Sequence, residues 1–194
     1  MAQTYSPTST ANELANDLAS QINGKVVLTT GVSPSTLGSS FVQSIATAQP
    51  KLLILAGRNT TKLEKVASTI SAAHPRVQIR LLELDLFSLA AVRDSAAKVN
   101  AWDDVPHIDI LVNNAGVMAT EFKLSPEGVE SQFATNHLGH FLFANLVMDK
   151  ILAASEPRIV NVSSDGHRLS PMRWGDHNFE VGILAHTLHQ SLRC

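Results

Sequence analysis

The sequence predicts an α/β fold in which a doubly wound parallel sheet of about five strands carries helices on both faces. Short, continuously apolar segments alternate along the chain with longer segments of helical period. The apolar segments have no regular polar positions, as a sheet buried on both faces requires. The 194 residues, of which 44% are hydrophobic and 16% charged, suffice for one domain with a buried core.

The expected elements alternate strictly after a polar start. Strands are predicted over 25–30, 52–56, 77–84, 108–113 and 158–163, and helices over 12–22, 37–48, 60–73, 88–100 and 126–154. We expect Asn23 and Gly24 to end the first helix, Ser88 to cap the fourth, and Pro126 to begin the fifth. In such a sheet a ligand binds at the carboxyl ends of the strands.

Composition excludes several classes of partner. The net charge of −2 gives no electrostatic reason to expect binding to nucleic acid or to an acidic membrane surface. No apolar run approaches the roughly 18 residues of a transmembrane helix, and residues 1–10 lack the pattern of a signal peptide. The single cysteine, Cys194, cannot form an intrachain disulfide, which fits a reducing compartment. We therefore expect a cytoplasmic protein that binds neither nucleic acid nor membrane.

A glycine-containing loop follows the first strand. It runs from Thr30 to Gly38, and a helix comes directly after it. Gly31 would supply the tight turn, Gly38 would let the helix pack close to the strand, and the Thr36 hydroxyl could donate to phosphate oxygens. The alternative is a serine-rich connection that binds nothing, because a degenerate glycine loop is weak evidence by itself.

The end of the second strand favours the ligand-binding interpretation. Arg58 follows this strand about 20 residues beyond the glycine loop, where NAD-binding domains usually place a carboxylate. A guanidinium suits the 2′-phosphate of NADP because it can make bidentate, charge-assisted hydrogen bonds. The alternative is a solvated surface arginine. The pattern predicts a Rossmann-type domain for NADP(H) over 24–164, preceded by an N-terminal segment over 1–23.

Three further motifs close later strands in order. Leu84-Asp-Leu86, Asn113-Asn-Ala-Gly116 and Asn161-Val-Ser-Ser164 join Thr30-Gly31 and Gly57-Arg58. Together they resemble the short-chain dehydrogenase/reductase family over about residues 20 to 180. The resemblance is to its retinol-dehydrogenase-like and fungal biosynthetic branch. It implies an NADP(H)-dependent oxidoreductase that acts on an alcohol or ketone of an apolar small molecule.

The resemblance assigns roles to the cofactor side of the site. Leu37 would contact the cofactor in the phosphate loop, and Asp85 would accept a hydrogen bond from the adenine amino group. The Leu86 amide would bond the ring, while Asn114 and Gly116 would line the side of the adenosine ribose. For Asp85 the alternative is a helix cap before Ser88.

The resemblance also assigns roles on the substrate side. Asn136 would hold a water in a proton relay, and Ser164 would hydrogen-bond the substrate oxygen. The alternatives are a polar residue in mid-helix and a turn residue at a strand end. His137 and His140 lie three apart on the same predicted helix, but no third ligand has suitable spacing, so no metal is expected.

The family pattern breaks after Ser164. The family uses a tyrosine and, four residues later, a lysine, whereas here the only tyrosine is Tyr5 and the last lysine is Lys150. We expect 165–194 to be an incomplete, divergent tail. We also expect the family's last strands to be missing, the fifth strand to be an unpaired edge, and the isolated chain to be marginally stable. The alternative function is a catalytically inactive NADP-binding fragment or pseudoenzyme, and a homo- or heterodimer through 126–154 is a further expectation.

Overall fold

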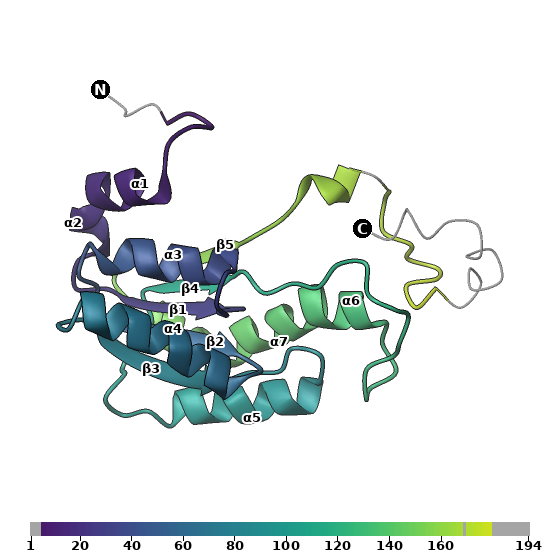
Figure 1. Ribbon diagram of the computed structural model, residues 1–194. Coiled ribbons are helices and arrows are strands. Elements are labelled where there is room, and N and C mark those ends of the chain that lie inside the picture. The colour runs from purple at the N-terminus through teal and green to yellow at the C-terminus, as the bar shows by residue number, and fades with distance from the viewer. Residues whose placement is uncertain (1–4, 169, 180–194) are drawn as a thin grey trace.

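The computed structural model describes residues 5–168 and 170–179. At its centre lies a parallel sheet of order β3-β2-β1-β4-β5 (Figure 1). Its strands are β1 (Val26–Thr30), β2 (Leu52–Gly57), β3 (Gln78–Glu83), β4 (Ile110–Asn113) and β5 (Arg158–Asn161). The chain leaves β1 toward β2 on one side and returns to β4 on the other. The predicted doubly wound fold is therefore confirmed.

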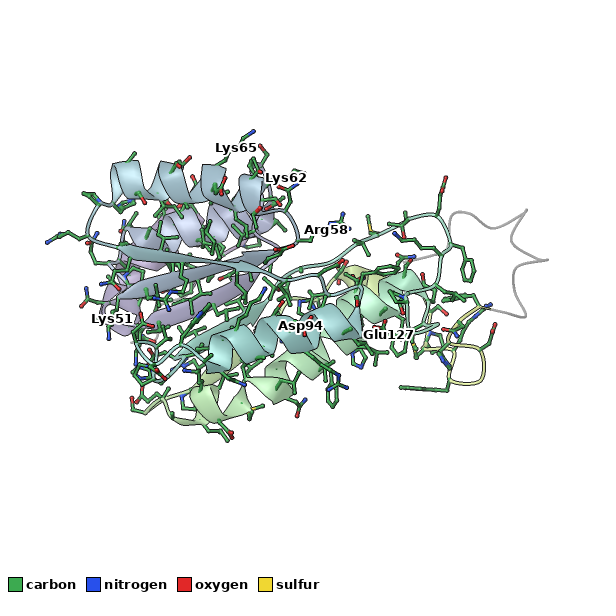
Figure 2. The ribbon with its side chains drawn as sticks, turned by 90° about the horizontal axis from the view of Figure 1, so that it is seen from below. Lys51, Arg58, Lys62, Lys65, Asp94 and Glu127 are labelled. Atoms are coloured by element: carbon green, nitrogen blue, oxygen red, sulfur yellow. The ribbon has the colours of Figure 1, made fainter. Side chains whose placement is uncertain are left out.

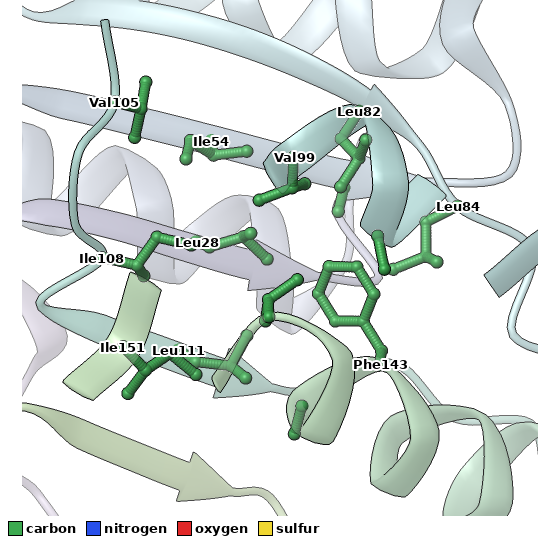
Figure 3. Packing of buried hydrophobic residues seen from close by; sticks show 14 of the residues in the cluster. Leu28, Ile54, Leu82, Leu84, Val99, Val105, Ile108, Leu111, Phe143 and Ile151 are labelled. Carbon is green, nitrogen blue, oxygen red and sulfur yellow. The ribbon is translucent and has the colours of Figure 1, made fainter. Parts of the chain in front are cut away.

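Helices cover both faces of the sheet. They are α3 (Leu37–Ala46) and α4 (Thr60–Ala73) on one face and α5 (Leu89–Asn100) and α7 (Gly139–Leu146) on the other. Because side chains alternate along a strand, Leu28 and Ile54 pack toward α5 and α7 around Phe143, as Figure 3 shows. Val27 and Leu53 pack toward α3 and α4. This alternation explains why nearly every residue of β1 and β2 is buried.

Two short helices precede the sheet. The sequence predicts one helix over 12–22, whereas the structure has α1 (Ala11–Asp17) and α2 (Ala19–Ile22). Leu18 separates them because its backbone angles, φ −97° and ψ 12°, leave the helical region. α1 packs against α3, so the N-terminal segment rests on the domain.

The predicted start of the helix over 126–154 is wrong. Residues 125–128 instead form a turn in which the Ser125 carbonyl accepts a hydrogen bond from Gly128 N at 2.9 Å. Pro126 occupies the second position, which its fixed φ suits as well as it suits the first turn of a helix. The turn is closed by an antiparallel bridge between Leu124 and Glu130.

The remainder of that segment is helical but not continuous. It consists of α6 (Ser131–Phe133), a π-helical turn η1 (Ala134–Leu138), α7, and α8 (Met148–Leu152). Glu130 begins α6, because its Oε2 accepts hydrogen bonds from Gln132 N and Phe133 N. Val147, with φ −102° and ψ 10°, separates α7 from α8.

Within the part of the chain that the structure describes, β5 forms one edge of the sheet and β3 the other. Among the described residues β5 pairs with β4 alone, and it is shorter than the predicted 158–163. Its apolar side chains are partly accessible, with 38% of Ile159 and 45% of Val160 exposed. Within residues 5–168 and 170–179, every helix is too short or too polar to cross a lipid bilayer.

Two phenylalanines on α7 test which face of this helix stabilises the fold. We expect Phe143→Ala to lower the free energy of unfolding by about 3–5 kcal/mol, because the ring is fully buried against β1 and β2. Phe141→Ala, at a ring that is 62% exposed, should lower it by less than about 1 kcal/mol. Urea denaturation followed by circular dichroism measures both values. Equal losses would show that the packing described for α7 is wrong.

Candidate active site

A cavity of about 330 Å³ opens at the carboxyl ends of β1, β2, β3 and β4. It brings together every residue that the sequence predicts for cofactor binding. These residues are Gly31, Thr36, Leu37, Gly38, Arg58, Asp85, Leu86, Asn114 and Gly116. They come from four separate connections, and they meet because the ends of parallel strands share one edge of the sheet.

Gly31 sits where two strand ends touch. Its φ of +73° lies in the left-handed region, and a Cβ there would lie 2.6 Å from the Cα of Ala115. A Cβ at Gly38 would lie 2.7 Å from the Gly31 carbonyl oxygen. The chain can therefore approach closely at both points only without a side chain, and the cavity keeps an exposed backbone floor.

Thr36 begins α3. Its Oγ1 accepts a hydrogen bond from Ser39 N at 3.3 Å and donates to the Ser33 carbonyl at 2.7 Å. The hydroxyl proton is thus directed within the loop, not toward a ligand as the sequence suggested. What the helix start offers to the cavity is its free backbone N–H groups and its positive dipole end. This end suits an anion such as a phosphate.

Arg58 lies at the mouth of the cavity, directly after β2. Figure 2 shows it at the same end of the sheet as Lys62, with Lys51 at the opposite end. Asn59 begins α4 by accepting a hydrogen bond from Lys62 N at 2.9 Å, which fixes the backbone next to Arg58. The guanidinium is exposed, and no acidic partner for it is present among the described side chains. This cation is therefore free to meet an anionic ligand.

Asp85 lines the same cavity. Its Oδ1 accepts a hydrogen bond from Phe87 N at 3.1 Å, and its Oδ2 accepts from none of the described residues. It does not cap α5. That position belongs to Ser88, whose Oγ accepts from Ala91 N at 3.3 Å, as predicted. The Glu127 carboxylate supports the same helix end by accepting from Ala90 N at 3.2 Å.

A larger cavity of about 960 Å³ lies on the other side of the β4–α6 connection. It contains both residues predicted for the substrate side, Asn136 and Ser164. Leu37 and the stretch 114–117 line both cavities, so the two spaces meet along this wall. The two groups of residues that the sequence predicts therefore line adjoining cavities. A reaction between a bound cofactor and a second ligand requires such an arrangement.

The side chain of Asn136 holds the wall between the cavities. Its Nδ2 donates to the Val117 carbonyl and its Oδ1 accepts from Val117 N, both at 2.8 Å. Ser164 Oγ accepts from Gly166 N at 3.2 Å and donates to none of the described residues. Its proton is therefore available to an oxygen bound in the larger cavity.

Three histidines also line the larger cavity: His137, His140 and His167. His137 stacks between Phe133 and Phe141, with ring centroids 5.4 Å and 6.4 Å apart. The sequence interpretation considered His137 and His140 only as metal ligands, and it missed the place of His140 beside Asn136. Its spacing of four from Asn136 was the available signal, since this spacing places both on one helix face. Across residues 5–168 and 170–179, no three His, Cys, Asp or Glu side chains gather to hold a metal ion.

Comparison with known proteins relates both cavities to one family. Residues 25–174 match the family model described as short chain dehydrogenase. The chain is 34% identical over 180 residues to oxidoreductase fscI of Fusarium equiseti, which covers 90% of this chain and 69% of that protein. It is 36% identical over 160 residues to human retinol dehydrogenase 13, covering 82% of this chain and 47% of that protein. The chain thus spans about half the length of several of its curated relatives.

Solved structures share the fold. An uncharacterised protein from Mycobacterium paratuberculosis superposes with a TM-score of 0.64 at 34% identity, covering 84% of this chain and 55% of that one. A short-chain dehydrogenase from Escherichia coli CFT073, solved in complex with NADPH, gives a TM-score of 0.64 at 23% identity, covering 82% of this chain and 67% of that one.

Two glycines with the same backbone angle separate conformational strain from crowding. Gly24 has φ +74° with nothing within 4 Å of a Cβ, so Gly24→Ala should lower the free energy of unfolding by about 1–2 kcal/mol through strain alone. Gly31→Ala adds an overlap with Ala115 and should cost about 1–3 kcal/mol more. Urea denaturation of both variants measures the difference. A Gly31→Ala protein as stable as Gly24→Ala would disprove the close approach at the cavity floor.

Proposed function

Because this chain belongs to the short-chain dehydrogenase family, we propose that it is an NADP(H)-dependent oxidoreductase acting on an alcohol or ketone of an apolar small molecule. The family consists of oxidoreductases that use nicotinamide cofactors. The observation that carries the choice of NADP(H) is Arg58 at the mouth of the smaller cavity. No carboxylate occurs between Gly57 and Thr60 to hold an unphosphorylated ribose. The NADPH bound by the Escherichia coli structure supports this choice.

The smaller cavity fits such a cofactor. The first turn of α3 would hold the pyrophosphate through its N–H groups, with Gly31 and Gly38 keeping the backbone close. Arg58 would bind the 2′-phosphate, which its fork of N–H donors matches. Asp85 would accept from the adenine amino group and the Leu86 amide would bond the ring. Asn114 and Gly116 would line the ribose.

The larger cavity would hold the substrate beside the cofactor's reactive end. Its apolar lining includes Met118, Phe141 and Met148, which suits an apolar molecule. When bound, the nicotinamide supplies or accepts the hydride, and the protein contributes orientation and proton handling. Ser164 would donate a hydrogen bond from its hydroxyl group to the substrate oxygen. Asn136 would act by fixing the wall at Val117 rather than by contacting the substrate.

One observation favours a second function. No tyrosine or lysine follows Ser164, and Tyr5, the only tyrosine, lies outside the residues that line either cavity. A positioned acid typically contributes about 10²- to 10⁴-fold to a rate. A protein that binds NADP(H) without turning over a substrate would keep the smaller cavity and need no acid. Both functions share the cofactor and differ only in the chemistry of the larger cavity.

The proposal includes location and assembly. A cytoplasmic location follows from the sequence expectations given above. A dimer with an identical or related chain would use α7 and α8, where Leu152 exposes 66% of its surface. The sequence predicted a dimer through one helix over 126–154, and α7 and α8 are the parts of this range that would form the contact.

Replacing Arg58 tests the choice of cofactor. We expect Arg58→Gln to weaken NADPH binding by about 10- to 100-fold, the loss of a charge-assisted hydrogen bond, and to leave NADH binding unchanged. Arg76→Gln is the control, because Arg76 lies beyond the opposite end of α4. Fluorescence titration of both dinucleotides gives the dissociation constants. A variant that loses NADH and NADPH equally would argue against contact with the 2′-phosphate.

A single-turnover assay separates the two functions. If the chain is an enzyme, NADPH absorbance should fall in the presence of a reactive diketone. Ser164→Ala should slow the reaction by about 10²-fold, because the oxygen loses its donor. Ser155→Ala, on the exposed α8–β5 connection, serves as the control. A wild-type chain that binds NADPH and never oxidises it has the second function.

A further inference from the structure

His140 connects the two cavities from inside the protein. It is 6% exposed and stands at the beginning of α7, one turn after Asn136. Its Nε2 lies 2.9 Å from Thr30 Oγ1 at the end of β1, and its Nδ1 lies 3.3 Å from the Asn136 carbonyl. The imidazole therefore spans the distance between the central strand and the π-helical turn.

The Thr30 hydroxyl carries one proton, which needs a hydrogen-bond acceptor. Its oxygen accepts hydrogen bonds from Asn114 N and Ala115 N, both at 3.0 Å, which occupies both lone pairs. Thr30 is fully buried, so leaving its proton without an acceptor would be costly. Two acceptors are in reach: His140 Nε2 at 2.9 Å and the Val112 carbonyl at 3.4 Å. The shorter contact makes His140 the better acceptor.

The surroundings also determine the tautomer of His140. Nδ1 faces a carbonyl oxygen and must carry a proton to bond it, so Nε2 has a free lone pair for the Thr30 hydroxyl. An imidazolium would instead point a second N–H at an oxygen with no lone pair left. Burial lowers the pKa of His140, the Asn136 carbonyl opposes this, and the charge of His137 lowers the pKa further. Within the described chain, His137 is the titratable group that acts on this ring from the elements packed against it.

We infer that His140 is a positioning residue, whose neutral form with the proton on Nδ1 holds Thr30 and thereby the turn 114–116 that forms the wall of the cofactor cavity. Ala115 packs directly against Gly31, so a shift of this turn changes the cavity floor. Protonation of His140 releases the Thr30 hydroxyl from Nε2 and weakens cofactor binding. This last consequence rests on the proposed function, whereas the tautomer and the hold on Thr30 do not.

Imidazole NMR of the full chain tests the tautomer without any cofactor. We expect His140 to show a protonated Nδ1 and an unprotonated Nε2. It should stay neutral as the pH falls through about 6.5, the ordinary pKa of a histidine. A proton on Nε2, or titration of His140 at the ordinary histidine pKa, would overturn the inference.

Amide hydrogen exchange tests the hold on Thr30. The N–H groups of Asn114 and Ala115 should exchange faster in His140→Ala, and at wild-type rates in His140→Gln, whose amide oxygen can replace Nε2 as acceptor. His74→Gln, at the end of α4, is the control. Unchanged exchange in His140→Ala would overturn the inference. If His140→Ala does not fold, the wild-type chain tests the inference instead. Exchange at the N–H groups of Asn114 and Ala115 must then accelerate as His140 becomes protonated.

NADPH titration between pH 5 and 8 tests the consequence for the cofactor. The wild-type and His74→Gln chains should bind more weakly as the pH falls. His140→Gln should lose this dependence, and His140→Ala should bind about tenfold more weakly at pH 8, the effect of one lost hydrogen bond to a buried group. If the wild-type chain binds no NADPH at any pH, the proposed function fails, and the NMR and exchange results still decide the role of His140. NADPH binding in His140→Gln with the wild-type pH dependence contradicts the inference.

Discussion

The contact between the ends of β1 and β4 is the constraint on which the rest of the site depends. These strands are neighbours in the sheet, yet their connections leave toward opposite edges. Three features join them: the Thr30 hydroxyl, which accepts from two consecutive backbone N–H groups; the side-chain Nδ2 of Asn114, which donates to the Thr30 carbonyl at 2.8 Å; and the packing of Gly31 on Ala115. Because these contacts are close, no space opens between the ends of β1 and β4. Space opens beyond them, where the two connections diverge. The smaller cavity lies on one side of the contact between the strand ends and the larger cavity on the other.

Local sequence was sufficient to predict the strands up to Asn113 and the helices α3, α4 and α5. β1, β2 and β4 are buried at nearly all positions, and the cap at Ser88 acts over a few residues. The cofactor-side residues could be grouped for a topological reason. Each follows a parallel strand, and the ends of such strands share one edge. Asp85 and Arg58 meet at one cavity although neither residue type nor spacing alone would bring them together.

The second half depends on contacts that are distant in sequence. The turn at Pro126 is supported by Asn178, which accepts from Glu130 N and donates to the Gly128 carbonyl, both at 2.9 Å. Pro126 suits a turn and a helix start equally well, so this residue alone could not separate the two. The π-helical turn likewise coincides with the two bonds between Asn136 and Val117. Helical periodicity carries no information about such contacts, which is why a single long helix was the natural and wrong prediction.

The two cavities differ in how firmly their walls are held. The smaller cavity rests on β1 and β2, whose backbone and side chains are buried between two layers of helices. The larger cavity has β5 as one wall, and the end of β5 is joined to β4 by the Asn113–Asn161 side-chain bond at 2.9 Å and by Val162 N on the Asn113 carbonyl at 3.0 Å. Ser164 lies beyond that attachment. Changes after Ser164 can therefore alter the larger cavity while leaving the wall of the smaller cavity intact, since that wall takes its support from Thr30 and the strands before it. Under the proposed function, cofactor binding and turnover would therefore depend on walls that are supported separately.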